Sequence, residues 1–107
     1  MSIHISRGDS DPILGQMIEA LRAYEANHPH ARIDLYRLNP VSVRVRIIDP
    51  DLAGLSRVDR NDNVWKYLDA LSDEAQADLS SLVLITPEET ARSFSNLAFE
   101  EPVSMEL

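Results

Sequence analysis

The chain has 107 residues, a net charge of −8 and no cysteine. This length suits one domain with a single core, and 44% apolar with 26% charged residues is typical of a globular chain. The lack of cysteine excludes disulfides, thiolate nucleophiles and thiolate metal ligands. The acidic excess lies entirely in residues 51–107, with twelve acidic and four basic side chains. Nucleic acid is therefore disfavoured as a partner.

Neither end of the sequence predicts a membrane or export segment. The longest apolar run, Leu82 to Ile85, is far shorter than the roughly 20 residues of a membrane-spanning helix. Residues 1–11 lack an apolar segment after a basic start, so they do not resemble a secretory signal peptide. We expect a cytoplasmic protein that makes no membrane contact.

Residues 10–27 predict an amphipathic helix. Asp11 supplies a capping oxygen, and Pro12 suits the first helical position. The apolar residues that follow recur at helical spacing, namely Ile13, Leu14, Met17, Ile18, Leu21 and Tyr24. Pro29 and its polar neighbours oppose continuation, so the helix should end near Asn27. Residues 1–9 are expected to form a flexible tail.

Two runs of alternating apolar residues follow and predict a β-hairpin, because only Asn39 and Pro40 separate them. The apolar positions of these runs are Ile33, Leu35, Val41, Val43, Val45 and Ile47. Arg44 and Arg46 lie on the opposite side of the second strand. One face of the sheet should thus be buried and the other wet or lightly covered.

A second helical pattern begins after Gly54. Its apolar members are Leu55, Val58, Val64, Trp65, Leu68 and Leu71, among which Trp65 is expected at the core or its edge. Ser72 and Asp73 then cap a further short helix over 74–79.

The last predicted elements are a strand and a helix. Residues 82–85 are apolar but too few for a helix, so they predict a buried strand. Residues 86–89, Thr-Pro-Glu-Glu, form a capping box with proline at its first position. We expect a short helix that carries Ala91 and Phe94 inward, and then a flexible acidic tail over 98–107.

Together these elements predict a single α+β domain over residues 10–97, with a three-stranded mixed sheet, helices on one face and the order α-β-β-α-α-β-α. The segment "DLAGLSRVDRNDNV" is similar to the Phe-x-Gly-x-Ser-x-x-x-Arg-His-Arg-x-Val motif of the BolA-like family, and "LSSLVLITPEE" resembles that family's last strand running into Thr-Pro-Glu. The resemblance implies a fold similar to the second class of KH domains. The matching positions are Leu52, Gly54, Ser56, Arg60 and Val64.

The resemblance also implies a partner. In the family, the histidine of this motif coordinates an iron–sulfur cluster that is shared with a monothiol glutaredoxin. That position is Asn61 here, and the following arginine is Asp62; an amide is a poor iron ligand. We therefore expect no cofactor and a non-enzymatic interaction or regulatory module, which binds a protein partner, a monothiol glutaredoxin among the candidates. The expected contact residues lie within 54–63 and are Gly54, Ser56, Arg57, Arg60 and Asn61.

Other interpretations stay open at this point. Gly54 and Ser56 suit a simple turn and helix cap, and Arg57 and Arg60 suit a solvated helix with local charge pairs. A glutaredoxin-linked adapter with altered ligands, a small enzyme and a self-associating domain are the alternatives to an interaction module. No matched nucleophile and base support an enzyme.

Two further features bear on these alternatives. The His28-x-His30 pair could hold a metal but has no evident third ligand, so a surface loop is the favoured interpretation. A short edge strand could pair with its copy, and we expect a monomer or a weak homodimer.

Overall fold

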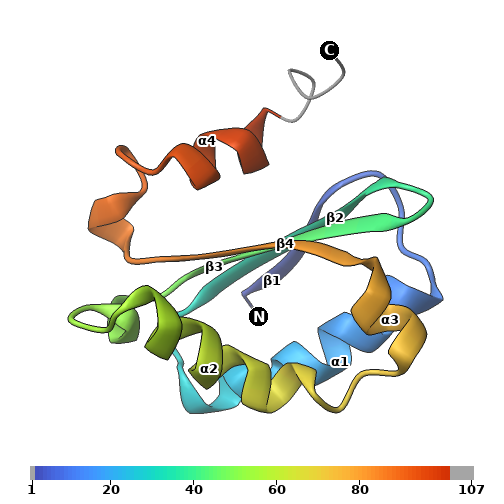
Figure 1. Ribbon diagram of the computed structural model, residues 1–107, viewed down its shortest axis with the longest axis horizontal. Coiled ribbons are helices and arrows are strands. Elements are labelled where there is room, and N and C mark those ends of the chain that lie inside the picture. Colours follow the sequence, from blue (N-terminus) through green and yellow to red (C-terminus); the bar gives the residue numbers. More distant parts are fainter. Residues whose placement is uncertain (1, 102–107) are drawn as a thin grey trace.

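The structure, a computed structural model, describes residues 2–101. Its centre is a four-stranded mixed sheet in the order β1-β2-β3-β4, with helices on both faces (Figure 1). The elements in chain order are β1 Ile3–Arg7, α1 Pro12–Asn27, β2 Arg32–Asn39, β3 Ser42–Ile48, the 3-10 turn η1 Pro50–Leu52, α2 Arg57–Leu68, α3 Asp73–Asp78, β4 Leu79–Ile85, the 3-10 turn η2 Pro87–Glu89, and α4 Phe94–Glu100.

The first helix begins and ends where the sequence predicts. Asp11 caps α1 by accepting a hydrogen bond from the Leu14 N–H at 2.9 Å, and Pro12 occupies the first turn. The predicted apolar stripe is buried against the sheet at Ile13, Leu14, Met17, Leu21 and Tyr24. None of the helices in residues 2–101 has both the length and the apolar character needed to cross a membrane.

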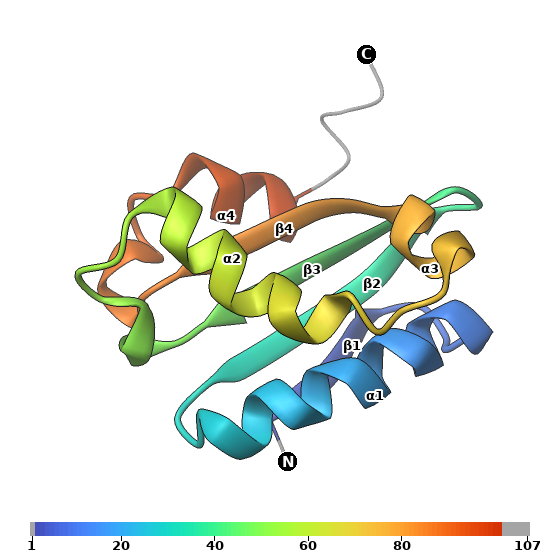
Figure 2. The same ribbon diagram turned by 60° about the horizontal axis from the view of Figure 1, so that its bottom comes forward.

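The predicted hairpin is confirmed, since β2 and β3 pair antiparallel. On the far side of β3, β4 pairs with it in parallel. Val43, Val45 and Ile47 of β3 are fully buried against the three helices α1, α2 and α3, which cover this face (Figures 1 and 2). The main core thus lies between these helices and the sheet.

The prediction of three strands is wrong, because Ile3–Arg7 form a fourth strand. Ile3 and Ile5 pair in parallel with Ile33 and Leu35 of β2 and pack against the main core. The expected N-terminal tail therefore contributes β1. Its partner strand is remote in sequence and follows a helix, so the local pattern alone does not reveal the pairing.

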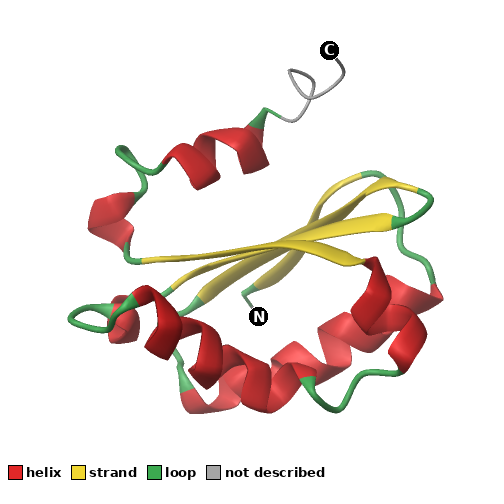
Figure 3. Ribbon diagram, viewed as in Figure 1, coloured by secondary structure: helices red, strands yellow, loops and turns green. Residues whose placement is uncertain are grey.

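The prediction that all helices lie on one face is also wrong, because α4 covers the opposite face (Figures 1 and 3). Phe99 of α4 is 3% exposed and packs with Tyr36, Val83 and Ile85. The Tyr36 hydroxyl donates to the Phe99 carbonyl at 2.7 Å, and the Arg46 guanidinium lies 4.6 Å from the Phe99 ring centroid. An apolar patch on this sheet face explains why it recruits a helix.

The C-terminal predictions also need correction at Ala91 and Phe94, which do not point inward. The Thr-Pro-Glu-Glu segment makes only the turn η2, and α4 begins separately, with Ser93 accepting from the Asn96 N–H at 3.0 Å. Ala91 is therefore exposed before the helix, and Phe94 is 86% exposed at its first position. Residues 98–100 of the expected tail belong to α4, whereas residues 102–107 lie outside the described residues.

Candidate functional site

A groove of about 930 Å³ lies along β4, between the start of α2 and the segment that joins η2 to α4. Figure 2 shows β4 running between α2 and α4. The α2 side contributes Arg57, Val58 and Asn61, and the opposite side contributes Arg92 and Phe94. The groove therefore combines a strand edge with cationic, amide and apolar side chains.

Two of the five predicted contact residues, Gly54 and Ser56, do not line the groove but shape the chain beside it. Gly54 has a φ of 81°, a left-handed conformation that favours glycine. Ser56 caps α2, and its hydroxyl accepts a hydrogen bond from the Asp59 N–H at 3.1 Å. The structural interpretation of both residues as turn and cap is confirmed.

Arg60 lines the groove but is engaged by the protein itself. Its guanidinium donates to both carboxylate oxygens of Glu89, at 2.7 and 3.0 Å, and also to the carbonyls of Leu84 and Leu55. These charged hydrogen bonds raise the pKa of Arg60 and hold the pKa of Glu89 at about 2. Arg60 therefore buttresses the wall of the groove by tying α2 to η2.

The two other predicted residues, Arg57 and Asn61, are exposed on the groove. Arg92 lies on its opposite side and is also exposed. Within residues 2–101, neither Arg57 nor Arg92 forms an ion pair. Both guanidinium groups are thus available to an anionic side chain.

Two apolar side chains face solvent at the same groove. Val58 is 68% exposed and Phe94 is 86% exposed. Val58 was expected among the apolar positions of the second helix. At 100° per residue, however, it lies about 120° from Val64 around the helix, and this offset is the sequence signal that could have identified it.

The edge of β4 that faces the groove carries unpaired main-chain groups. The Asp49 N–H donates to the Ile85 carbonyl at 2.9 Å, so the polar groups of Ile85 face β3. Because successive residues of a strand alternate in direction, those of Leu84 and Leu82 face away from β3. Within residues 2–101, the guanidinium of Arg60 on the Leu84 carbonyl, at 3.1 Å, is the one bond made to this edge.

The predicted His28-x-His30 pair does not come together as a metal site. The possible ligand group found in the described residues combines His28 with Asp49 and Asp51, and it does not include His30. His28 is partly buried, whereas His30 is exposed in the turn before β2.

Comparison with family models, with curated proteins and with solved structures finds no match for this chain. The resemblance to the BolA-like family rests on the motif residues alone. The functional conclusion must therefore come from the geometry of the groove.

Proposed function

We propose that the protein is a non-enzymatic interaction module that binds an extended, acidic segment of a partner protein along β4. The observation that carries the proposal is the open edge of β4, where the main-chain groups of Leu82 and the N–H of Leu84 face a groove. An extended peptide added to a sheet edge gains affinity from main-chain hydrogen bonds and specificity from alternate side chains.

The charge of the groove favours an acidic segment. Arg57 and Arg92 project from opposite sides of it, and both lack an ion-pair partner within residues 2–101. Arginine pairs well with carboxylates, because its planar fork can form two parallel hydrogen bonds. Carboxylates of the partner should therefore lie over these two guanidinium groups.

The exposed apolar pair supplies the second element of recognition. Val58 and Phe94 would be partly desolvated by an apolar side chain of the segment, which gives a hydrophobic contribution that solvent-exposed charge pairs lack. Asn61 can donate to and accept from the peptide main chain. The favoured ligand is therefore an extended segment in which acidic and apolar residues both occur.

In this proposal the five residues expected from the sequence have two roles. Arg57 and Asn61 contact the partner, whereas Gly54, Ser56 and Arg60 hold the groove in shape. The proposal requires neither a cluster nor a metal at the groove, and a monothiol glutaredoxin remains one candidate partner through its surface segments.

A random-peptide phage library provides a probe that assumes no partner. Selection on the immobilised protein should enrich peptides with acidic and apolar residues, and the best of them can be synthesised with a fluorescent label for anisotropy titration. We expect Arg57→Glu to weaken binding about tenfold or more, which corresponds to about 1.4 kcal/mol. Lys66→Glu is the matched control, because Lys66 is an exposed cation of α2 outside the groove.

The selection can also contradict the proposal. Peptides without acidic residues, or peptides whose affinity falls equally in Arg57→Glu and Lys66→Glu, would argue against recognition by this groove. Circular dichroism of each variant establishes that a lost signal reflects binding rather than unfolding.

A further inference from the structure

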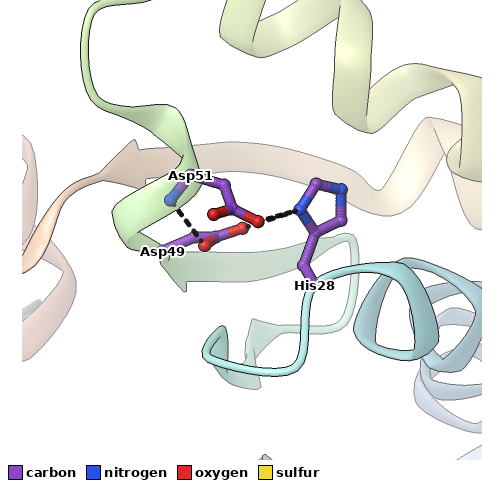
Figure 4. Close-up of side chains that lie close together, drawn as sticks. All are labelled: His28, Asp49 and Asp51. Carbon is purple, nitrogen blue, oxygen red and sulfur yellow. Dashed lines mark hydrogen bonds and ion pairs between the residues drawn. The ribbon is translucent and has the colours of Figure 1, made fainter.

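A second cluster of polar side chains lies away from the groove residues described above. It joins His28, which follows α1, to Asp49, which follows β3, and to Asp51 of η1 (Figure 4). The Nδ1 atom of His28 is 2.8 Å from Oδ2 of Asp51 and 3.3 Å from Oδ2 of Asp49. One imidazole nitrogen thus faces two carboxylates at once.

The charge of this cluster is unbalanced. Asp49 is fully buried, and its carboxylate accepts from the Tyr24 hydroxyl at 2.6 Å and from the Asp51 N–H at 2.9 Å. Within residues 2–101, no lysine or arginine pairs with Asp49 or Asp51. A buried carboxylate is costly without a cation beside it, and Nδ1 of His28 can offer at most one proton to two carboxylates.

We infer that His28, Asp49 and Asp51 form a binding site for a divalent transition-metal ion of the Zn²⁺ type. The three possible ligand atoms all lie within 4.8 Å of one another. Ligands bound about 2.1 Å from one Zn²⁺ ion lie about 3 to 3.4 Å apart, which is close to the separations between Nδ1 and the two carboxylate oxygens. A mixed set of one imidazole and two carboxylates suits Zn²⁺ better than Ca²⁺, which prefers oxygen ligands.

The surrounding residues hold these ligands in place. The imidazole of His28 stacks on the Tyr24 ring, with 4.1 Å between centroids and 15° between planes. The same Tyr24 donates its hydroxyl hydrogen to Asp49, and such outer hydrogen bonds orient metal ligands. Tyr24 thus fixes two of the three ligands.

The cluster is also accessible to an ion from solvent. The side chain of Asp51 is 51% exposed and that of His28 is 25% exposed, whereas that of Asp49 lies inside. Three protein ligands leave at least one coordination position for water. A bound ion would fasten the end of α1 to η1, and its role would be structural. This inference is independent of the peptide groove.

Zinc titration of the chelator-treated, tag-free protein tests the site. Isothermal titration calorimetry should show one Zn²⁺ per chain, and the melting temperature should rise with Zn²⁺. His28→Phe removes the nitrogen but keeps a ring to stack on Tyr24, and Asp51→Asn removes a charge at an exposed position. We expect each change to weaken Zn²⁺ binding at least tenfold, while His30→Ala, the matched histidine control, binds as the wild type does.

The opposite results would overturn the inference. Absence of saturable one-to-one binding, or equal affinity of the wild type and His28→Phe, would leave His28 as a hydrogen-bonding residue only. Loss of binding in His30→Ala with none in Asp51→Asn would place the ion on the two histidines instead. Tighter binding of Ca²⁺ than of Zn²⁺ would contradict an imidazole ligand.

Discussion

The residues from Gly54 to Asn61 alternate between two kinds of work on adjacent positions. Gly54 and Ser56 set the turn and the cap, and Arg60 fastens α2 to Glu89. Arg57 and Asn61 belong to the same helix but project into the groove. A substitution in this segment therefore alters folding or binding according to the direction of its side chain.

The backbone of Gly54 gives a prediction for stability. Its φ of 81° is unfavourable for alanine, although no heavy atom lies within 4 Å of an added Cβ. We expect Gly54→Ala to lower the free energy of unfolding by about 1 to 2 kcal/mol through backbone strain. Gly15→Ala is the control, because Gly15 lies inside α1 with the same open space. That change should raise stability by about 0.5 to 1 kcal/mol. Urea unfolding measures both, and equal effects of the two substitutions would contradict the assigned backbone.

The pair of Arg60 and Glu89 gives a prediction for pH dependence. The pKa of Glu89 is about 2 in the folded protein, below its ordinary value of 4.5, because Arg60 bonds to the carboxylate. The pair therefore stabilises the folded state fully above about pH 4.5, and this contribution is lost as the pH falls toward 2. The melting temperature of the wild type should exceed that of Glu89→Gln at pH 7, and the difference should narrow between pH 5 and 2.

Glu88→Gln serves as the control for this comparison, since Glu88 is exposed and does not contact Arg60. Its melting temperature should follow that of the wild type across the same pH range. A constant difference between the wild type and Glu89→Gln from pH 7 to 2 would contradict the low pKa of Glu89.

At the scale of elements, α4 is held to the outer face of the sheet by a few specific contacts. Phe99 is buried there, and Arg46 pairs with Asp34 at 2.6 Å and with Glu100. The Arg44 guanidinium donates to the Ala98 carbonyl at 3.0 Å. The arginines that the sequence places on a wet face are thus the residues that bind the last helix.

The two phenylalanines of α4 give opposite predictions. Phe99→Ala should lower the free energy of unfolding by about 3 kcal/mol, because it leaves a cavity beneath the helix. Phe94→Ala should change stability by less than about 0.5 kcal/mol, since this ring is exposed. Phe94→Ala should nevertheless weaken binding of the selected peptide. Thermal and urea unfolding measure the first two effects, and a larger loss of stability in Phe94→Ala would contradict the placement of α4.

The sequence predicts some of these elements well and others not at all, for physical reasons. Local signals such as the Asp11 cap and the alternating hairpin residues determine α1, β2 and β3. By contrast, β1 depends on pairing with a remote strand, and the separate start of α4 depends on Ser93 acting as a cap after a turn. A capping box before a proline predicts only that a helical turn begins, and not how long it continues.

At the scale of the whole molecule, the order of the strands determines what the groove can do. On one side, β1 covers the edge of β2, while β4 forms the other edge of the sheet. The helices α2 and α4 lie on opposite faces on either side of β4, so their starts enclose this edge (Figures 1 and 2). The groove is therefore a product of the fold rather than of one motif.

The site was accordingly predictable only in part. Arg57 and Asn61 were identified from their helix, because a local motif contains them. The edge of β4, together with Phe94, was not, because strand order and the face chosen by α4 are properties of the tertiary structure. The meeting of His28 with Asp49 has the same origin, since the two residues are brought together by α1 and β3 packing side by side.

The most direct test of the central claim is amide hydrogen exchange along β4, measured by NMR with and without the selected peptide. In the free monomer, the amides of Leu82 and Leu84 should exchange faster than those of Val83 and Ile85, which face β3. The peptide should slow exchange at Leu82 and Leu84 by about tenfold or more and leave the other two nearly unchanged. Slow exchange at Leu82 and Leu84 in the free protein, or no change on binding, would contradict strand addition at this edge.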